Sequence, residues 1–389
     1  MILISLLAFF AFAALSVTLV IAIVNTITFP RLRVPPPSSA PLIHPSADTP
    51  LISILIPARN EANAIANTIR ALRAQSYMPF EVILLDDQST DGTPDIARAA
   101  AQGDPRIQII AGQPLLEGWL GKNWACHQLS NEARGRVLIF TDADVQWQPD
   151  ALKSVVAMMQ RTQADLLTVW PTQITVTRSE RLVVPLIALA IFGYLPALLV
   201  QNTPYPSLAA ANGQCLAFKK SAYQSVGGHV AVRASIVEDI SFARRIKAKG
   251  LRLIMADGAG LITCRMYRNW REVREGFAKN ILAGYGGRVS FLALATVFHW
   301  LIFVLPWLWL LIGWLTVGIG GWPLVPLLLI ALGVIVRGLT AFATRQRLRD
   351  ALWMPVSALL MTIIAGQAVW WQWRYGGARW KGRTFKGAR

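Results

Sequence analysis

The chain has 389 residues, of which 54% are hydrophobic and only 15% are charged. Soluble domains usually carry about 25% charged residues, so this composition excludes an ordinary soluble protein and indicates a membrane protein. The formal net charge of +17 indicates an anionic partner, but the basic residues flank apolar segments and no zinc-finger or RNP-type signature occurs. A membrane surface or an anionic substrate is therefore expected, and no nucleic acid.

The first predicted element is a transmembrane anchor over residues 1–30. Residues 2–29 are almost wholly apolar and uncharged, which is long enough to cross a hydrocarbon core of about 30 Å. A cleaved signal peptide would need a basic start and a shorter apolar stretch, so the anchor is expected to be retained. Arg31 and Arg33 place the following domain in the cytoplasm. Residues 31–50, rich in Pro and Ser, predict a linker.

Residues 51–290 predict a cytosolic α/β domain with a Rossmann-like, mostly parallel sheet. Short apolar runs alternate with segments of helical periodicity, as in sheets with helices on both faces. Asn60 is expected to cap the first helix. The expected strands are Ile52–Ile56, Glu81–Leu85, Arg106–Ile110 and Val137–Thr141, and the expected helices cover 61–76, 91–102 and 122–133.

Acidic residues follow two of these strands, at the carboxyl ends where such sheets bind ligands. Asp86 and Asp87 end the second strand, and Asp87 can accept hydrogen bonds from a nucleotide base or ribose. The run Asp-Gln-Ser-Thr-Asp-Gly could instead form a turn. Asp142 and Asp144 follow the fourth strand one residue apart, and such a pair can hold Mg²⁺ or Mn²⁺ against a diphosphate.

A third acidic pair, Glu238 and Asp239, precedes a predicted helix over Ile240–Ala248. A carboxylate there could act as the general base that takes a proton from an attacking hydroxyl. It could equally cap the helix, which is a common role for an acidic residue at that position. The residues alone leave both interpretations open.

An apolar stretch over residues 182–200 lies inside the α/β domain. A single membrane crossing there would put the acidic clusters on opposite sides of the bilayer. We therefore expect interfacial helices broken at Pro185 and Pro196, which would bring the site close to the membrane surface. An ordinary buried helix is the alternative.

Residues 291–373 predict C-terminal membrane helices, beginning with a hairpin of 291–319 and 322–343 turned at Gly318–Pro323. Arg337, near the inner end of the second helix, is expected to reach the membrane interface with its charged head or to contact a headgroup.

The segment 351–373 is long enough to span, but its flanks conflict with a crossing. Arg345–Arg349 on one side and the basic tail 374–389 on the other both belong in the cytoplasm. The alternative is a re-entrant or interfacial segment, which the belt of Trp370, Trp371 and Trp373 favours. Both interpretations stay open, and the chain is expected in the cell membrane as a multi-pass protein with a cytoplasmic catalytic domain.

Six motifs within residues 50–290 together resemble glycosyltransferase family 2, whose catalytic domain has the GT-A fold. In order they are ISILIPARNEANAI, EVILLDDQSTDGT, GWLGKNWA, VLIFTDADV, ANGQCLAFKKSAY and VEDISFARRI. Each is weak alone, but the combination in this order is specific. The resemblance implies an inverting transfer in which a general base activates an acceptor hydroxyl, and a metal stabilises the leaving nucleoside diphosphate.

The family also implies roles for particular residues. The nucleotide-sugar would be held by the loop after the first strand, by an aspartate that contacts the nucleotide base, by a lysine near the diphosphate and by an aspartate near the ribose. The metal would be held by the second aspartate of the Asp-Ala-Asp pair together with the first. Asp239 would be the general base of catalysis. Carried across, the nucleotide-sugar residues are Pro57, Arg59, Glu61, Asp87, Lys122 and Asp142, the metal residues are Asp144 and Asp142, and the acceptor or diphosphate side includes Asn212, Gln214 and Glu238.

One family motif is altered here. Processive members carry QxxRW near the membrane, whereas this chain reads Arg265-Met-Tyr-Arg268-Asn-Trp270. The missing Gln and the extra residue argue against processive synthesis. Arg268 could still face the diphosphate, and Trp270 could stack on a sugar or belong to an apolar core.

The GWxGK segment, the internal apolar stretch and the C-terminal WKGR are similar to a narrower set of membrane glycosyltransferases. These act on hydrophobic acceptors and include ceramide, hopanoid-associated and carotenoid (chlorobactene-type) glucosyltransferases. The resemblance implies transfer of one sugar from a UDP-sugar, such as UDP-glucose, to the hydroxyl of a membrane lipid. The alternatives are a polyprenyl-phosphate glycosyltransferase and a processive polysaccharide synthase. The sequence indicates no oligomeric state.

Overall fold

The structure is a computed structural model that describes residues 2–36, 49–316, 321–380 and 383–386. The chain divides into two compact units. The sheet unit comprises Phe29–Ile174 and Leu199–Met266, and the helical unit comprises Met1–Thr28, Thr175–Leu198 and Tyr267–Arg389. Much of the predicted linker and part of the predicted basic tail lie outside the described residues.

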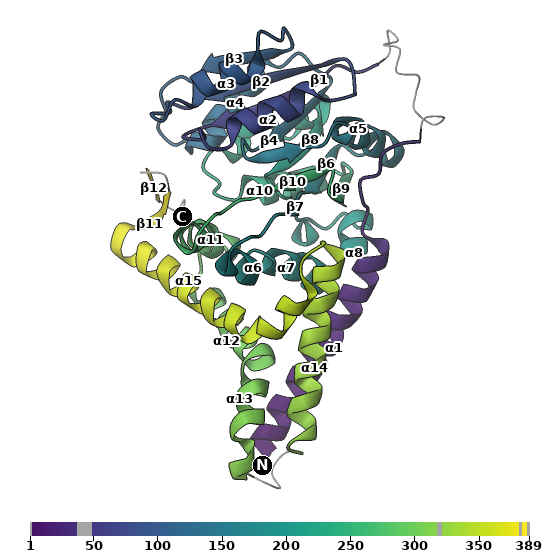
Figure 1. Ribbon diagram of the computed structural model, residues 1–389, viewed down its shortest axis with the longest axis vertical. Helices are drawn as coiled ribbons and strands as arrows, with labels where there is room; N and C mark the ends of the chain where they lie inside the picture. The colour runs from purple at the N-terminus through teal and green to yellow at the C-terminus, as the bar shows by residue number, and fades with distance from the viewer. Residues whose placement is uncertain (1, 37–48, 317–320, 381–382, 387–389) are drawn as a thin grey trace. The chain divides into compact units, whose positions relative to one another are not determined.

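A seven-stranded sheet forms the centre of the sheet unit (Figure 1). Its spatial order is β3-β2-β1-β4-β8-β6-β9, and only β8 runs antiparallel to its neighbours. The expectation of a mostly parallel sheet is confirmed. The strands are β1 (Ile52–Ala58), β2 (Phe80–Asp86), β3 (Ile107–Ala111), β4 (Val137–Thr141), β6 (Leu166–Trp170), β8 (Cys215–Lys219) and β9 (Leu253–Asp257).

Helices cover both faces of this sheet, which is why β1 and β2 are buried along almost their whole length. Helix α2 buries Ile65, Ile69 and Leu72, whose spacing puts them on one face. A small second sheet has the order β5-β10-β7. These elements are α2 (Ile65–Arg73), α3 (Thr93–Ala101), α4 (Gly121–Glu132), α5 (Ala151–Thr162), α9 (Lys220–Ser225), α10 (Glu238–Ala248), β5 (Val145–Trp147), β7 (Thr172–Gln173) and β10 (Ile262–Cys264).

The start of α2 differs from the prediction. The helix begins at Ile65, four residues later than expected, and Asn60 does not cap it. Asn60 adopts a left-handed backbone with φ of 52°, and its side-chain oxygen accepts a hydrogen bond from the backbone N–H of Thr90 at 2.9 Å. Its side chain therefore joins two loops instead of satisfying a helix end.

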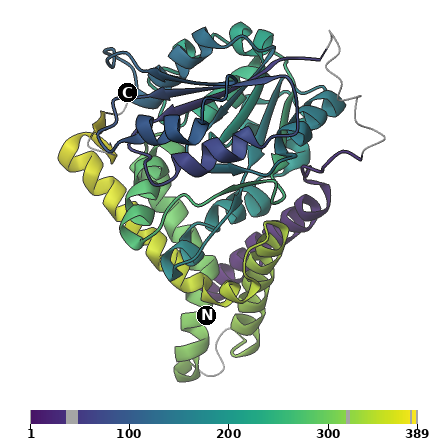
Figure 2. The same cartoon turned by 45° about the horizontal axis from the view of Figure 1, so that its top comes forward.

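Among the described residues of the helical unit, three helices are long and apolar enough to cross a membrane: α1 (Ile2–Thr28), α14 (Leu324–Ala343) and the segment Leu348–Tyr375, which includes α15 (Met354–Tyr375). Figure 2 shows the unit from a second direction. Its other elements are α6 (Arg178–Val183), α7 (Leu186–Tyr194), α8 (Ala197–Asn202, which continues into the sheet unit), α11 (Trp270–Gly284), α12 (Val289–Phe303), α13 (Leu305–Ile312), the 3-10 helices Gly313–Thr316 and Leu348–Trp353, and the hairpin β11 (Gly377–Trp380) and β12 (Arg383–Lys386).

The apolar stretch 182–200 consists of short helices. The chain breaks at Pro185, before α7, and at Pro196, before α8. Asn25 of α1 stabilises the second break: its amide nitrogen donates to the carbonyl of Leu195 at 2.7 Å, and its oxygen accepts from the N–H of Ala197 at 3.1 Å. Helix α1 is therefore part of the folded helical unit and not only an anchor.

The C-terminal helices correct two expectations. The first arm of the predicted hairpin is interrupted at Val304, between α12 and α13, and the turn at Gly318–Pro323 lies partly outside the described residues. Arg337 was expected at the interface, but it is only 1% exposed. Nearby Asp350 is also buried, and it accepts a hydrogen bond from Arg181 Nε at 2.9 Å.

Candidate active site

The carboxyl ends of β1 and β2 are joined by direct hydrogen bonds. The N–H of Asp87 donates to the carbonyl of Ala58 at 2.7 Å, and Arg59 Nη1 donates to the carbonyl of Asp87 at 2.6 Å. The side chain of Asp87 is 8% exposed, and its Oδ2 lies 4.0 Å from Arg59 Nη1. Pro57 precedes this contact within β1, next to Leu85 in the register. The predicted nucleotide residues Pro57, Arg59 and Asp87 therefore lie together.

The run Asp-Gln-Ser-Thr-Asp-Gly both forms a turn and contributes to the candidate site. Asp91 accepts a hydrogen bond from the N–H of Thr93 at 3.1 Å, as a turn residue does. The Thr93 hydroxyl accepts from the N–H of Glu61 at 2.8 Å, so this turn also supports the first loop. Asp91 is the turn former, whereas Asp87 is held toward Arg59.

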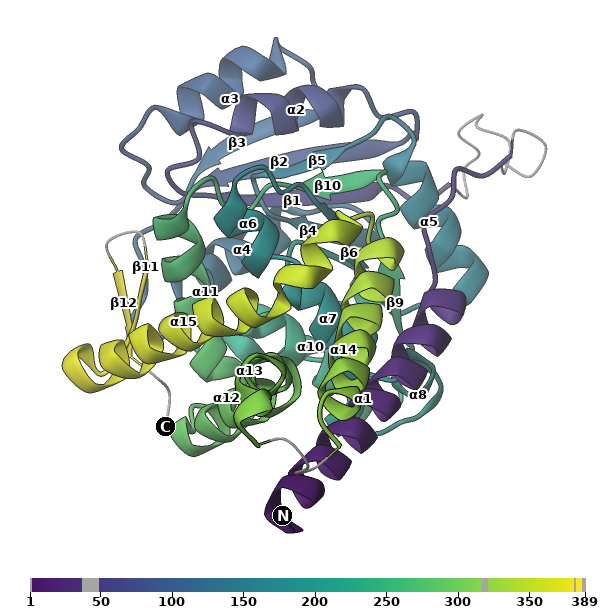
Figure 3. The same cartoon turned by 60° about the horizontal axis from the view of Figure 1, so that its bottom comes forward.

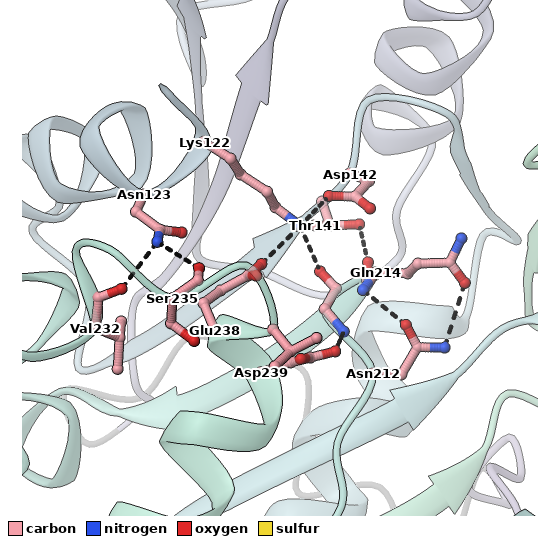
Figure 4. A network of polar contacts seen from close by, with 12 residues as sticks. Lys122, Asn123, Thr141, Asp142, Asn212, Gln214, Val232, Ser235, Glu238 and Asp239 are labelled. Carbon is pink, nitrogen blue, oxygen red and sulfur yellow. Dashed lines mark hydrogen bonds and ion pairs between the residues drawn. The ribbon is translucent and has the colours of Figure 1, made fainter. Parts of the chain in front are cut away.

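Lys122 connects two acidic clusters that are far apart in the sequence (Figure 4). Its Nζ lies 2.8 Å from Asp142 Oδ1 and 3.0 Å from Glu238 Oε1. Burial by itself lowers the pKa of Lys122, but the charges of Asp142 and Glu238 outweigh it and hold that pKa well above its usual value. The lysine is therefore a fixed cation between the end of β4 and the start of α10.

Asp239 is oriented by two backbone donors. Its Oδ2 accepts from the N–H of Gly213 at 2.9 Å, and its Oδ1 accepts from the N–H of Ile240 at 2.8 Å. Burial and the neighbouring charge of Glu238 raise the pKa of Asp239 to about 7. The carboxylate can therefore accept a proton near neutral pH, as a general base must.

Gly213 lies in the middle of this group. A Cβ at this position would be 3.2 Å from Glu238 Oε1 and 3.3 Å from Lys122 Nζ. Lys122 Nζ also lies 3.5 Å from the Gly213 carbonyl oxygen. The absence of a side chain lets the backbone approach three charged groups at once.

Asp144 fits the role of a metal ligand. Burial, and then the charges of Asp142 and Glu61, raise the pKa of Asp144 to about 7, and a cation there would relieve that repulsion. No ion pair joins Asp144 to a lysine or arginine within the described part of the chain. Carboxylate oxygens are the donors that Mg²⁺ and Mn²⁺ prefer. Among the described residues, no group of three or more His, Cys, Asp or Glu side chains is arranged to hold a metal ion, so Asp144 stays a predicted metal ligand.

Asn212 and Gln214, which were expected near the sugar or acceptor, lie in a polar network. Gln214 is 7% exposed; its amide nitrogen donates to Cys264 Sγ at 3.0 Å, and its oxygen accepts from Gln173 Nε2 at 2.9 Å. The Cys264 thiol in turn donates to Asp144. This network holds the carboxylate of Asp144, the predicted metal ligand, in place.

Asn123 is a site residue that sequence reasoning missed. Its amide nitrogen donates to the carbonyls of Val232, Arg233 and Ser235 at 2.9, 3.1 and 3.0 Å. It thereby attaches the start of α4 to the loop that leads to Asp239 (Figure 4). Its place directly after Lys122 was the available signal, but the loop it binds is about 110 residues away in sequence.

Arg268 and Trp270 belong to the helical unit. The backbone N–H of Arg268 donates to Glu272 at 2.8 Å. Trp270 is half-buried beside the apolar cluster that contains Val273, which agrees with the core interpretation of this residue. Their proposed contacts with the diphosphate and sugar stay predictions.

Residues 53–227 match the family model described as Glycosyl transferase family 2. This segment is a family 2 glycosyltransferase domain. The predicted family, the enzyme class and the GT-A fold are confirmed, and the matched residues include the glycosyltransferase motifs at Asp87, Lys122 and Asp142.

The glycosyltransferase has relatives with a named activity. A 4,4'-diaponeurosporenoate glycosyltransferase of Staphylococcus haemolyticus (strain JCSC1435) is 27% identical over 263 residues, covering 65% of this chain and 67% of that protein. The protein of the same name from Staphylococcus aureus (strain USA300) is 26% identical over 259 residues, with 64% and 65% covered. The chain thus spans about two thirds of the length of these relatives.

Solved structures support the fold of the glycosyltransferase. The mannosyltransferase PcManGT from Pyrobaculum calidifontis, solved in complex with GDP-Man and Mn²⁺, aligns with a TM-score of 0.56 at 19% identity. The alignment covers 94% of this chain and 99% of that one. At this identity the likeness concerns the fold.

Proposed function

We propose that the protein transfers one sugar from a nucleoside diphosphate sugar to a hydrophobic membrane lipid. The observation that carries this proposal is the group formed by Lys122, Asp142, Glu238 and Asp239, in which a fixed cation and an oriented carboxylate meet within hydrogen-bonding distance of Gly213. The apolar helices and the names of the relatives support a lipid acceptor.

The donor diphosphate would be held between the ends of β1, β2 and β4. Arg59 and Asp87, which are hydrogen-bonded to each other, would contact the nucleoside, and Lys122, which is paired with Asp142, would offset the charge of the diphosphate. Asp144, with Asp142, would hold a divalent ion. When bound, that ion supplies positive charge that stabilises the leaving nucleoside diphosphate.

For a hydroxyl acceptor, the step is a single displacement. The acceptor oxygen bonds to C1 of the sugar while its proton passes to the Asp239 carboxylate. The bond between C1 and the diphosphate oxygen breaks, its electron pair leaves with the nucleoside diphosphate, and the configuration at C1 inverts. Lys122 neutralises negative charge as it develops on that side.

The name of the relatives introduces a second class of acceptor. Their printed name specifies the anion of a carotenoid acid, so their acceptor offers a carboxylate at the end of an apolar chain. A carboxylate with an ordinary pKa of about 4 is already ionised at neutral pH. Such an acceptor needs no general base, whereas a lipid hydroxyl does, and this difference can be measured.

The experiment is a lipid analysis of cells with the intact protein and with Asp239→Asn. A new glycolipid whose mass increases by one hexose would establish transfer and identify the acceptor. Loss of that product in Asp239→Asn, with donor binding intact, supports a hydroxyl acceptor. Retained turnover would favour a carboxylate, or the phosphate of a polyprenyl chain, and a product of several linked sugars would indicate processive synthesis.

The donor and metal are tested by binding. We expect UDP-glucose to bind more tightly than GDP-mannose, in the presence of Mg²⁺ or Mn²⁺ only. Titration calorimetry with and without a chelator measures both points, and Asp144→Ala should abolish the metal dependence. Equal UDP binding without divalent ions would remove Asp144 from the metal site.

We further propose a membrane orientation. Helix α1, the successive helices α12 and α13, and α14 would cross the bilayer, with the sheet unit in the cytoplasm. The basic flanks Arg31, Arg33 and Arg345–Arg349 support this orientation by the positive-inside rule. The sugar would then be transferred at the cytoplasmic leaflet.

A further inference from the structure

The packing of the helical unit points to a distinct role for α15. We propose that α15 does not cross the membrane but lies inclined within a single leaflet, the one adjoining Arg345–Arg349, with its outer face in the headgroup and upper acyl region. The helix has 22 residues, about 33 Å in length, which would be enough to cross. The helices packed against α15 indicate that it does not cross.

The C-terminal half of α15 packs along α11. Ile364, Ala365, Ala368 and Trp371 form one buried face, and they belong to a single apolar cluster with residues of α11 that include Val273, Ala278 and Leu282. This half of α15 therefore lies at the same depth as α11.

Helix α11 cannot lie in hydrocarbon. Within 15 residues it carries Arg271, Glu272, Arg274, Glu275 and Lys279, and charged side chains inside a bilayer cost several kcal/mol each. Arg271 has a side chain that is 81% exposed. Helix α11 must therefore lie at the aqueous interface of the membrane, and the second half of α15 lies at the same level. The remaining half, about 16 Å, is too short to reach the opposite side.

The direction of α15 agrees with this depth. Helices α11 and α12 diverge by 113° at their junction. Met354, in the first turn of α15, belongs to a cluster with Ile302 near the far end of α12, whereas Trp371 belongs to the cluster of α11. A helix joining these two points runs back toward α11 and crosses the direction of α12 obliquely. Figure 3 shows α15 lengthwise while α12 and α13 are seen almost end-on.

The outer face of α15 suits a membrane interface. Leu359, Ile363, Trp370 and Trp373 are 40%, 54%, 47% and 81% exposed. Tryptophan is enriched where acyl chains meet headgroups. Arg379 follows and stacks on Tyr375, with 4.6 Å between its guanidinium carbon and the ring centroid. An apolar, tryptophan-bearing face ending in arginines matches a leaflet with anionic headgroups.

The first test locates the two ends of α15. Three variants place single reactive thiols at exposed positions: Arg347→Cys before α15, Arg374→Cys in its last turn and Arg379→Cys after it. Cys126, Cys215 and Cys264 are at most 1% exposed, so the unaltered chain gives the background. We expect all three variants to react with a membrane-impermeant maleimide only after cells are permeabilised, and Ile2→Cys to react in intact cells.

The outcomes distinguish this proposal from the membrane orientation proposed above. That orientation decides only on which side of the membrane the two ends of α15 lie. Reaction of the 374 and 379 thiols in intact cells, without reaction of the 347 thiol, would show that α15 crosses and overturn the proposal. Reaction of all three in intact cells would reverse the orientation while supporting a helix that returns to its starting side. Two positions at the C-terminal end of α15 protect the test against one poorly folded variant.

The second test examines the outer face itself. In proteoliposomes, a fluorophore on Ile363→Cys should be quenched by nitroxide-labelled phospholipids at least severalfold more than one on Arg374→Cys. Equal quenching at both positions would overturn lipid contact. Protection of position 363 from both lipid-borne and aqueous quenchers would indicate a protein partner instead, and would also contradict the proposal.

Discussion

The side-chain amide of Asn123 donates a hydrogen bond to the carbonyl of Ser235 at 3.0 Å. Because Asn123 directly follows Lys122, this bond connects the proposed diphosphate side of the site to the loop that leads to Asp239. The same nitrogen also donates to Val232 and Arg233. Proton transfer and displacement need both sides in fixed positions, so this asparagine is expected to act as a positioning residue.

Asn123→Ala should lower kcat by roughly tenfold or more, because misplacement of reacting groups by about 1 Å can cost as much as 100-fold. The apparent KM for the donor should change less, since Lys122 and Asp142 remain. Steady-state kinetics with varied donor provide the measurement. Asn131→Ala, at an exposed position of the same helix, is the matched control; an equal loss in both variants would argue for a general effect on α4.

Gly213→Ala tests the close approach at the centre of the site. The added methyl group would be 3.2 Å from Glu238 Oε1 and 3.3 Å from Lys122 Nζ, so one of these groups must move. We expect turnover to fall at least tenfold while thermal stability changes little. Gly250→Ala has open space around its Cβ but a positive φ, and should show the reverse pattern of lower stability with normal turnover.

The pH dependence of catalysis should report Asp239. Its pKa of about 7 predicts that kcat/KM falls as the pH drops through 7, because the protonated carboxyl cannot accept a proton. Asp239→Asn should lower kcat by roughly 10²–10⁴-fold and remove this limb. A profile that stays flat down to pH 6 in the unaltered enzyme would contradict base catalysis and agree with a carboxylate acceptor.

The same group predicts a change in stability with pH. The folded pKa of about 7 lies above the ordinary value of 3.8, so between these values the folded state binds more protons than the unfolded state. This group therefore makes the protein less stable as pH rises through that window. Asp239→Asn should raise the melting temperature, and the gain should be larger at pH 8 than at pH 5. Thermal unfolding in detergent at both pH values measures this, and an equal gain would contradict it.

Asn25→Leu tests whether α1 is part of the helical unit. The change removes the donor to Ile191, Phe192 and Leu195 and the acceptor for Ala197. Each buried backbone group left unpaired costs about 1–3 kcal/mol, so the melting temperature in detergent should fall clearly. Thr28→Val, at an exposed position of the same helix, is the control; a loss no larger than that of Thr28→Val would reduce α1 to an anchor.

The sequence alone was sufficient to predict the sheet and to place several candidate site residues at one edge of it. Strands such as Val137–Thr141 were predicted because an apolar run between turn residues has few other ways to be buried, and acidic residues at strand ends must share one edge of a parallel sheet. The same reasoning from strand ends predicted that Asp142 and Asp144 lie together and that Asp87 lies at the ligand-binding edge of the sheet.

Only the tertiary structure could decide contacts between residues distant in the chain. The pairing of Lys122 with Glu238, the donation from Asn123 to Ser235, and the packing of α15 on α11 have no local pattern in the sequence. They depend on how the chain folds back on itself, as does the burial of Arg337 that the sequence placed at the interface. Periodicity specifies which face of a helix is apolar, but the neighbour that covers this face is set by the whole fold.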